Sequence, residues 1–599
     1  MSEPTSASAL SRTWRLSPCP PEAVRAHVEA GVPHALAPIL AARGACPSRV
    51  RDILRPSLRN QLPDPARFRD MDKAAERIAA AVRAGERILV WGDYDVDGAT
   101  STAVLVRYLA GLGVTADIHI PDRMREGYGL NAEHLEKAAA EGVELVVVLD
   151  AGTVNFAEID AANAAGLEVV VVDHHAAEPE VPAAVAVVNP NRQDEDGAYG
   201  HLCAAGMTFL LVVALNARLR DAGDLKRWEV APDMMALLDL VALGTVADVV
   251  PLTGLNRAFV ARGLEVMNRL SNPGLAALAE KGGLQPPFNG YHCGFVLGPR
   301  INAGGRVGEA ETGARLLTSD DPDHCRMLAG KLDGWNLERQ EMERSCVASA
   351  REQVGDGPSD GVVIARGEDW HEGVIGIVAS RLKDAYDCPS FCFTVGADGL
   401  LKGSARSMAG FDLGEAVIAA RKAGILAKGG GHAMAAGLSV DPDKLEAFRA
   451  FVAERLADSD FARTGVVSEA DIALPLEHLS AALVEAFEAL QPFGVGNPRP
   501  RVLVQQAELS DADLLNDKQG NPAHLRLKLR APGGRRVKAI AFNVAHTNLP
   551  AGARALIGKP VEVLGTLDLD TFRGNYDVQI KLEDIRGASA DTDTRGAAA

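Results

Sequence analysis

Three aspartates stand at alternate positions directly after a short apolar run, in the stretch VWGDYDVDGATS. They are Asp93, Asp95 and Asp97, and the preceding residues RILVW are typical of a buried strand. Three carboxylates this close together repel one another, so something must offset the repulsion. A bound divalent cation would do so, because hard cations take several carboxylate ligands at once.

More acids stand at the ends of other apolar runs. Asp150 ends VELVVVLD, and Asp248 lies in the turn of LGTVADVVPL. The run LEVVVVDHH ends in Asp173, His174 and His175. Ligands bind outside the carboxyl ends of the strands of an open parallel sheet, so we expect these side chains to converge. Carboxylates with imidazoles and without thiols suit Mg²⁺ or, given the histidines, Mn²⁺. We expect two ions that share an aspartate and promote attack of water on a phosphoryl group.

Simpler explanations exist for each acid taken singly. An aspartate at a strand end often caps the following helix, and DYDVDG resembles part of a calcium loop. An EF-hand needs a glutamate at its twelfth position between two helices, whereas this loop follows a strand. Capping does not account for four acidic clusters. The sequence also contains no GxGxxG after the first strand and no GxxxxGKS or GxxxxGKT, which argues against dinucleotide and P-loop sites.

The elements around these acids alternate between strand and helix. From about residue 76, apolar runs alternate with helical stretches, and the runs are 87–91, 114–120, 143–150 and 167–175. This alternation is typical of a parallel sheet covered on both faces. Residues 201–270 are expected to be helical, and a long charged helix is expected within 309–356.

The second half of the chain has two further patterns. A second α/β pattern begins near GVVIARG, includes PSFCFTV and ends on KGGGHAMAAGLSV. Runs with a period of two residues then predict a small antiparallel β unit: HLRLKLR, RVKAIAFN, PVEVLGTLDLD and NYDVQIKLEDI.

The run HLRLKLR separates apolar from basic side chains. Its alternation places Leu525, Leu527 and Leu529 inside and turns the basic side chains to one outer face. The basic residues are Arg526, Lys528 and Arg530. A basic face on a small β-barrel of the OB type suits single-stranded nucleic acid, and a solvated surface strand is the alternative.

Composition and charge limit the class of protein. The 599 residues are 47% hydrophobic and 24% charged, as in ordinary globular proteins. Eight cysteines without a CxxC pair are typical of a reduced cytosolic protein. The start lacks the apolar core of a signal peptide, so we expect a cytoplasmic protein with no membrane segment. The net charge of -18 argues against nucleic-acid binding by the bulk surface, but residues 524–538 contain no acid.

Taken together, the motifs resemble the DHH phosphoesterase superfamily and, within it, the RecJ single-strand-specific exonucleases. The matching stretches are GDYDVDG (92–98), LDAGTVN (149–155), VVDHH (171–175) and GTVADVVPL (244–252). GPRINAGGRVG (298–308) resembles the RecJ connecting region, and GSARS (403–407) and GGGHAMAAG (429–437) resemble the DHHA1 domain. The resemblance covers roughly residues 40–585, with the motifs in the family's order.

The resemblance implies an α/β fold class with several domains. It comprises a parallel-sheet DHH phosphoesterase core, connecting helices, a second α/β DHHA1 domain and a C-terminal OB-like β-barrel. The expected boundaries are 1–75 for an N-terminal extension, 76–270 for the core, 271–356 for the connecting region with its long helix, 357–460 for DHHA1, 461–586 for the OB-like domain and 587–599 for a disordered tail.

The resemblance also assigns roles at the metal site. It implies five metal ligands, which are Asp95, Asp97, Asp150, His174 and Asp248. Asp150 would bridge two Mn²⁺ or Mg²⁺ ions and take part in catalysis together with Asp93 and His175. His175 would meet the scissile phosphate. Ala151 departs from the family, whose members more often have Cys or Asn there, but the neighbouring aspartate is present.

Substrate-binding residues are implied in two places. Ser404 and Arg406 share one face of an extended segment and would bind the 5′-phosphate together with Arg123. Arg300 and Arg306 would contact the strand backbone, with a structural ion pair as the alternative for either. Finally, backbone amides of GGGH near His432 could cradle a phosphate, or the glycines could serve a tight turn alone.

The activity implied is a metal-dependent exodeoxyribonuclease that degrades single-stranded DNA 5′→3′ to 5′-mononucleotides in recombination and repair. Single-strand-binding protein and a RecQ-type helicase are expected partners from the family, and a monomer is expected. One rival is a DHH-family phosphodiesterase acting on short oligonucleotides or cyclic dinucleotides, whose members generally lack the C-terminal β domain. A second rival is an inactive DNA-binding scaffold, which should have lost ligands that are all present here. The metal used in the cell, the preference between RNA and DNA, processivity and the role of residues 1–75 stay open.

Overall fold

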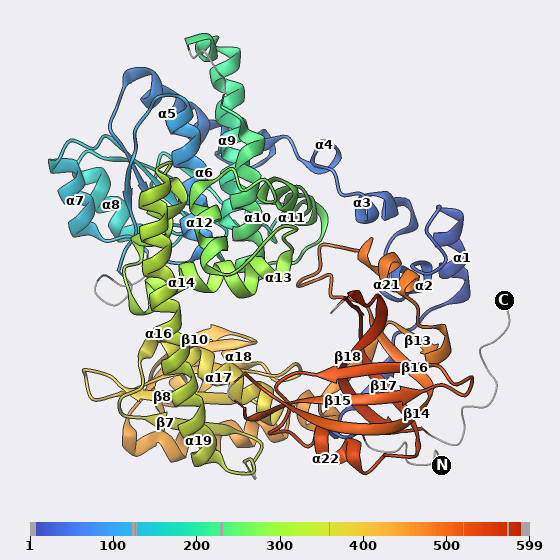
Figure 1. Cartoon of the computed structure of the whole chain (residues 1–599). Coiled ribbons are helices and arrows are strands. Elements are labelled where there is room, and N and C mark those ends of the chain that lie inside the picture. Colours follow the sequence, from blue (N-terminus) through green and yellow to red (C-terminus); the bar gives the residue numbers. More distant parts are fainter. Residues whose placement is uncertain are drawn as a thin grey trace. The chain divides into compact units, whose positions relative to one another are not determined.

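The computed structural model describes residues 8–122, 126, 129–227, 232–358, 360–518, 520–571 and 574–588 (Figure 1). They divide into two compact units. Unit 1 comprises residues 1–50, 341–491 and 499–599, and unit 2 comprises residues 51–340 and 492–498. The boundary falls within the expected long helix, α16 (Pro322–Val354). None of the described helices is long and apolar enough to cross a membrane.

A five-stranded sheet with only parallel pairings forms the centre of unit 2. Its order is β3-β2-β4-β5-β6. The strands are β2 (Ile88–Trp91), β3 (Asp117–His119), β4 (Leu145–Leu149), β5 (Glu168–Val172) and β6 (Ala186–Val188). β3 is shorter than the predicted 114–120, because it pairs with β2 over three residues only. β6 was not predicted, because three apolar residues are too few to show a pattern.

Helices bury both faces of this sheet. Ile88 and Val90 belong to the apolar core with α5, α6 and α9, whereas Leu89 and Val148 pack on the other face with α7 and α8. Figure 1 shows α7 and α8 beside each other at the edge of unit 2. The helices are α5 (Met71–Ala84), α6 (Val96–Gly111), α7 (Ala132–Ala140), α8 (Phe156–Ala164) and α9 (Ala204–Asp221). The continuous apolar strands predicted this two-sided burial.

A group of helices completes unit 2. They are α3 (Val50–Leu54), α4 (Leu58–Gln61), α10 (Leu238–Ala247), α11 (Gly254–Met267), α12 (Pro273–Lys281), α13 (Gly290–His292), the π-helical turn η5 (Cys293–Leu297), α14 (Gly298–Val307) and α15 (Glu311–Thr318). Gly244 lets α10 approach α6 closely, since a Cβ there would lie 2.4 Å from Thr100 Oγ1 and 2.9 Å from Asp97 Oδ1. The C-terminal end of α10 therefore reaches the aspartate loop.

Unit 1 contains a second α/β sheet of order β10-β11-β9-β8-β7, in which only β7 and β8 are parallel. Its strands are β7 (Val363–Gly367), β8 (Ser390–Val395), β9 (Leu401–Arg406), β10 (Leu426–His432) and β11 (Ala435–Val440). Its helices are α17 (Glu372–Tyr386), α18 (Leu413–Lys422), α19 (Leu445–Ala457) and α20 (Asp460–Thr464). α17 and the end of α16 cover one face, and α18 and α19 cover the other.

A closed five-stranded barrel forms the C-terminal part of unit 1. The strands run in the order β14-β15-β16-β18-β17, and β17 pairs back with β14. They are β14 (Arg501–Asn516), β15 (Pro522–Arg530), β16 (Arg536–Ala541), β17 (Pro560–Asp570) and β18 (Asp577–Gly587), with β13 (Ile472–Pro475), α21 (Ala481–Glu488) and α22 (Leu549–Arg554) beside them. Leu525, Leu527 and Leu529 are fully buried, as the alternation predicted.

The prediction of a purely antiparallel unit is wrong, because β16 pairs with β18 and β13 with β14 in parallel. A period of two residues shows which side chains point inward but carries no information on strand direction. The strand β14 was also missed.

The N-terminal segment contributes to both units. β1 (Thr13–Leu16) pairs in parallel with β12 (Val467–Ala470), and α1 (Pro21–Glu29) and α2 (Ala37–Ala42) follow within unit 1. From Arg51 onward the chain belongs to unit 2. At the other terminus, β18 ends at Gly587, and residues 589–599 of the predicted tail lie outside the described part.

Candidate metal centre

The loop after β2 positions three carboxylates at the carboxyl edge of the sheet. Asp95 caps α6, because its Oδ1 accepts hydrogen bonds from the amides of Asp97 at 2.8 Å and Gly98 at 3.2 Å. Gly98 is required by the turn, since a Cβ there would lie 2.3 Å from the carbonyl oxygen of Asp93. The capping explanation therefore holds for Asp95, and its side chain still lies within a cluster of possible ligands.

Asp97 is buried against the beginning of α9. The amide of Ala204 donates to Asp97 Oδ2 at 2.6 Å, and the amide of Ala205 donates to Oδ1 at 2.9 Å. The free amides and the dipole at a helix N-terminus stabilise a negative charge. Two fixed donors therefore hold this carboxylate in one orientation.

Asp150 follows β4 directly and has a left-handed backbone, with φ of +64°. Non-glycine residues rarely adopt this conformation, and it often occurs at functional sites. Asp150 Oδ1 lies 3.2 Å from His174 Nε2 and is buried without a hydrogen-bond partner in the described part of the chain. A buried carboxylate oxygen without a donor is a ligand position that a cation would satisfy.

Asp173 organises the two histidines that follow β5. Its Oδ1 accepts from the amide of His174 at 2.7 Å and from the amide of His175 at 3.1 Å. His175 Nδ1 lies 2.7 Å from the same oxygen, and Thr153 donates its amide to Oδ2 at 3.1 Å. Burial raises the pKa of Asp173, but these hydrogen bonds together with the charge of His175 hold it well below its usual value.

The environment of His175 favours its protonated form. Burial lowers the pKa of this imidazole, whereas the hydrogen bond and charge of Asp173 raise it more strongly, to about 9. Asp173 was noticed in the sequence as part of VVDHH, but no role was predicted for it. The missed signal was that an acid directly before two histidines can orient their rings.

Two asparagine side chains from the loop after β6 bind the backbone of His174 and His175. Asn189 donates to the carbonyl oxygen of His175 at 2.9 Å and to Thr153 Oγ1 at 2.8 Å. Asn191 donates to the carbonyl oxygen of His174 at 2.5 Å. The backbone of both histidines is therefore held from the neighbouring loop.

The side chains form three overlapping groups of possible ligand atoms, each within 4.8 Å of one another. The groups are Asp93 with Asp95 and Asp150, Asp150 with His174 and His175, and Asp97 with His174 and Asp248. Asp150 and His174 each belong to two groups, and of these two only the carboxylate has two oxygens that could serve two ions. Asp248 is the residue after α10, and its Oδ2 lies 3.8 Å from His174 Nε2. Asp93 and His175 therefore join the five predicted ligands as two further possible ones.

The electrostatics of this cluster fit a bound cation. Burial and the charges of neighbouring aspartates raise the pKa of Asp150 and Asp97, and raise that of Asp248 to about 9. The site thus gathers more desolvated negative charge than it can hold as free anions. Carboxylate oxygens with one or two imidazole nitrogens are the donor set for Mn²⁺ or Mg²⁺.

Comparison with known proteins identifies the family. The family models for the DHH N-terminal domain, the DHHA1 domain and the RecJ OB domain match residues 87–245, 359–458 and 470–584. The chain is 35% identical to the single-stranded-DNA-specific exonuclease RecJ of Escherichia coli over 94% of its own length and 97% of that protein. The chain belongs to the RecJ family. RecJ of Thermus thermophilus is 34% identical over 87% of this chain and 72% of that protein.

Solved RecJ structures share this fold. RecJ of Thermus thermophilus in complex with Mn²⁺ superimposes with a TM-score of 0.78 at 31% identity, covering 96% of this chain and 80% of that one. The complex of the same enzyme with Mg²⁺ gives a TM-score of 0.72 at 30% identity and covers 96% of this chain and 79% of that one. The same two ions were expected here from the donor set.

Two of the predicted DNA-contacting arginines of this RecJ chain lie on α14. Arg300 pairs with Asp333 at 2.9 Å and donates to the carbonyl oxygen of Val296 at 2.8 Å. Its pairing with Asp333 is the structural ion pair expected from the sequence as the alternative to DNA contact. Arg306 is half-buried near the end of the same helix. α14 contacts the aspartate loop, because Asn302 Oδ1 accepts from the Val96 amide at 3.2 Å.

The predicted 5′-phosphate residues of the RecJ chain lie partly in unit 1. Ser404 and Arg406 share one face of β9, and Arg406 donates to Ser404 Oγ at 3.2 Å. Burial lowers the pKa of Arg406. His432 is exposed and is the last residue of β10. The stretch GGGH is therefore strand, and the turn begins after His432. Arg123 lies outside the described residues.

The predicted basic face of the RecJ OB barrel carries acids as well. Arg526 pairs with Asp513 at 2.7 Å, and Lys528 pairs with Asp511 at 2.6 Å. Arg530 pairs with Glu508 at 3.0 Å. The expectation of a purely positive face is therefore wrong, because β14 supplies an acid opposite each basic side chain and the sequence pattern of β15 alone does not show its neighbour.

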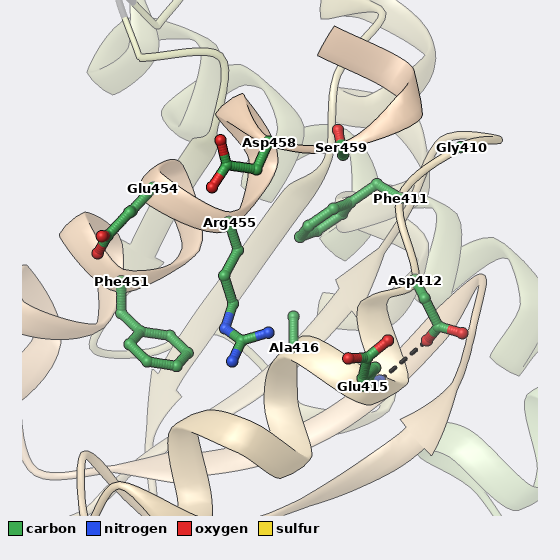
Figure 2. Close-up of a pocket in the computed structure, with 10 residues that line it drawn as sticks. All are labelled: Gly410, Phe411, Asp412, Glu415, Ala416, Phe451, Glu454, Arg455, Asp458 and Ser459. Atoms are coloured by element: carbon green, nitrogen blue, oxygen red, sulfur yellow. Dashed lines mark hydrogen bonds between the residues drawn. The ribbon is translucent and has the colours of Figure 1, made fainter. Parts of the chain in front are cut away.

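A separate cavity of about 580 Å³ lies between α18 and α19 in the DHHA1 region (Figure 2). Its lining includes one cation, Arg455, whose guanidinium lies over the ring of Phe451 at 4.9 Å. The acids in the lining are Asp412, Glu415, Glu454 and Asp458. This excess of negative charge opposes binding of phosphates, and none of the predicted site residues lines the cavity.

Two aromatic residues near the metal centre were not singled out from the sequence. Tyr291 and Phe295 are 64% and 70% exposed, and their rings stack at 5.0 Å with an interplanar angle of 22°. They lie on α13 and η5, and η5 contacts α10, which Asp248 directly follows. A spacing of four residues is typical of ordinary core packing on a helix, so nothing in the sequence indicated that these rings are exposed.

Proposed function

We propose that this chain hydrolyses single-stranded DNA from the 5′ end and releases 5′-mononucleotides, using two divalent ions, Mn²⁺ or Mg²⁺. The observation that carries the proposal is the convergence of every predicted ligand at one edge of the sheet, with Asp150 shared between two groups. The likeness to RecJ exonucleases over nearly the whole chain supports the substrate class. An inactive scaffold would not retain this set.

The residues of the site have distinct tasks. Bound ions would supply an activated water and neutralise charge on the phosphoryl oxygens. Asp93 and Asp95 would hold one position, and Asp97, His174 and Asp248 the other, with Asp150 shared between the two. Asp173 binds His175 Nδ1 and orients this partly exposed ring, whose Nε2 would donate a hydrogen bond to an oxygen of the scissile phosphate.

The DNA strand would be held by cations and by stacking. Arg306 and Arg300 on α14 are proposed to contact the backbone, and Ser404 with Arg406 to bind the 5′-phosphate. Arg123, His432 and the basic residues of β15 stay in the proposal as further contacts. Tyr291 and Phe295 offer bases a stacking surface, since every base has a π-face.

The stacking contact has its own test. Phe295→Ala is expected to weaken binding of an oligonucleotide by about 1–3 kcal/mol, the usual effect of removing one base–aromatic stack. An abasic nucleotide is then placed at each position of the strand in turn. At one position it should weaken binding to the wild type by the same amount, and at that position it should not weaken binding to the variant further. Equal losses at every position would rule out stacking at this residue.

The cellular role follows the family. We propose a monomeric cytoplasmic enzyme of recombination and repair that works with single-strand-binding protein and a RecQ-type helicase. Support for a reducing compartment comes from the cysteines, all eight of which are free. The six segments into which the sequence was divided are kept as part of the proposal.

The decisive experiment is digestion of 5′-labelled and 3′-labelled single strands and the matching duplex, with Mn²⁺ and with EDTA. Wild type is compared with Asp150→Ala and with Asp160→Ala, a matched control that removes an exposed aspartate on α8. We expect metal-dependent release of the 5′ label as mononucleotide from single strands only. Asp150→Ala should be inactive, and Asp160→Ala should match wild type.

Two other outcomes would replace the proposal. Cleavage confined to dinucleotides and trinucleotides would favour the phosphodiesterase of short substrates. Tight binding of single strands without cleavage under any metal would favour the scaffold. Release of the 3′ label first would overturn the polarity alone.

A further inference from the structure

A second group of metal-ligating side chains lies beside the catalytic edge and shares no residue with it. It consists of His119, the last residue of β3, Glu126 in the following segment and His134 in the first turn of α7. Their ligand atoms all lie within 4.8 Å of one another, and all three residues belong to the described part of the chain. The proposed nuclease activity gives this group no task.

The distances within the group suit a tetrahedral ion. Glu126 Oε2 lies 3.2 Å from His119 Nε2 and 3.5 Å from His134 Nδ1. With metal–nitrogen and metal–oxygen bonds of about 2.0–2.1 Å, two ligands of a tetrahedral Zn²⁺ ion lie about 3.3 Å apart. The two imidazole rings have centroids 4.8 Å apart, and each presents a nitrogen to the same carboxylate oxygen.

Hydrogen bonding among the residues leaves the group incomplete. Glu126 Oε1 accepts from the amide of Asp122 at 3.0 Å, which fixes the carboxylate and turns Oε2 toward the rings. A hydrogen bond joins Oε2 to His119, but His134 Nδ1 is buried without a hydrogen-bond partner in the described residues. A simple His–Glu pair accounts for one ring and leaves this second nitrogen unexplained.

The surroundings of His119 favour its neutral ring, and a cavity lies beside the two histidines. Burial lowers the pKa of His119, which favours the unprotonated ring that a metal requires. Trp91 packs on His119 with ring centroids 4.2 Å apart and fixes its plane. A cavity of about 230 Å³ is lined by both histidines, although not by Glu126, and is large enough to hold a water.

We propose that His119, Glu126 and His134 form a second metal site, for a borderline divalent ion of the Zn²⁺ class. Two nitrogens and one carboxylate oxygen are the donor set of a four-coordinate zinc site whose last position is water. The carboxylate-rich catalytic centre instead suits harder ions. The ion would join the end of β3 to the start of α7.

The test counts metal in four chains: wild type, Asp150→Ala, and each of these with His119→Ala/His134→Ala. After saturation with Zn²⁺ and gel filtration, zinc per chain is measured by plasma mass spectrometry. We expect the two histidine substitutions to remove one equivalent in both backgrounds, whatever the catalytic centre retains. His324→Ala, which removes an exposed histidine on α16, should remove none.

Cobalt provides an independent readout of ligation. Co²⁺ added to the Asp150→Ala chain should give the visible bands of a four-coordinate ion, and the histidine substitutions should abolish them. If the double substitution prevents folding, Glu126→Gln serves instead, because it keeps the side chain's size and should weaken Zn²⁺ binding at least about tenfold. Equal zinc content with and without the two histidines would overturn the site, and it would leave the nuclease proposal untouched.

Discussion

At the scale of single residues, the second layer around the metal centre sets its geometry. Asp173 belongs to none of the three ligand groups, yet it orients His175 and accepts the amides of both histidines. Two backbone amides at the start of α9 hold Asp97 in the same way. Fixed partners of this kind stabilise one arrangement of the ligands before substrate arrives.

Asp173→Asn should lower kcat by about 10–10²-fold, the usual effect of losing a partner that orients a ligand. An amide oxygen still accepts hydrogen bonds but no longer stabilises the charged ring of His175, so KM should change less than kcat. Steady-state digestion of a single strand measures both, with Asp160→Asn as the control. An unchanged kcat would contradict the orienting role.

Asp239 in the first turn of α10 predicts a dependence of stability on pH. Burial raises its pKa from 3.8 to about 6, while the amide of Leu240 and the charge of Arg107 oppose the shift. The folded chain therefore holds this proton more tightly than the unfolded chain. The stabilisation of the fold by this proton is fully present below about pH 4 and is lost as pH rises through about 6. The free energy of unfolding then falls by about 3 kcal/mol.

Asp239→Asn should abolish this loss. Denaturant unfolding of wild type and variant between about pH 4 and about pH 7 measures the difference, and Asp221→Asn, an exposed aspartate at the end of α9, is the control. Parallel pH profiles for wild type and Asp239→Asn would contradict the assignment.

At the scale of elements, β14 and β15 of the barrel balance each other's charge. Each basic residue of β15 faces an acid of β14, with Lys528 also 3.9 Å from Asp513. Exposed ion pairs add little to stability, so this balance has its main effect on the field above the barrel. The acids reduce the attraction for phosphates that the β15 sequence suggests.

Asp511→Ala/Asp513→Ala should therefore tighten binding of single-stranded DNA and make it more dependent on salt. Each freed cation that reaches a phosphate should add about 0.7 to the slope of log affinity against log salt. Fluorescence anisotropy at several salt concentrations measures the slope. As the matched opposite, Arg526→Ala/Lys528→Ala should lower both affinity and slope. No change in either pair of variants would exclude this face as a DNA contact.

At the scale of the whole molecule, segments far apart in sequence build each unit. Unit 1 takes residues from the N-terminus, the middle and the C-terminus of the chain. Arg43 donates to Asp471 at 2.7 and 3.0 Å, and the same carboxylate accepts from the amide of Arg501 at 2.8 Å. One half-buried acid thus links three parts of the sequence.

Asp471→Ala should destabilise unit 1 by about 1–3 kcal/mol, because Arg43 and the Arg501 amide both lose a charged acceptor. Thermal unfolding followed by circular dichroism measures the effect, and Asp458→Ala, an exposed acid at the end of α19, is the control. Equal melting temperatures would contradict a stabilising role for the Asp471 carboxylate.

Much of the metal centre could be read from the sequence. Continuous apolar runs indicated parallel strands, and the carboxyl ends of such strands share one edge, so acids after β2, β4 and β5 had to meet there. The same local reasoning located the leucines of β15, because alternation depends only on neighbouring residues. The same reasoning did not predict two strands, the short β6 and β14.

What the sequence by itself determined was therefore the set of candidate ligands, their edge of the sheet and the class of ion. Only the tertiary structure decided contacts between residues that no local pattern connects. It placed Asp173 under both histidines, set an acid of β14 opposite each cation of β15, ran β16 parallel to β18, and brought His134 to His119 and Glu126. The physical reason is that periodicity fixes the direction of a side chain within its own element, whereas its partner depends on which elements pack together.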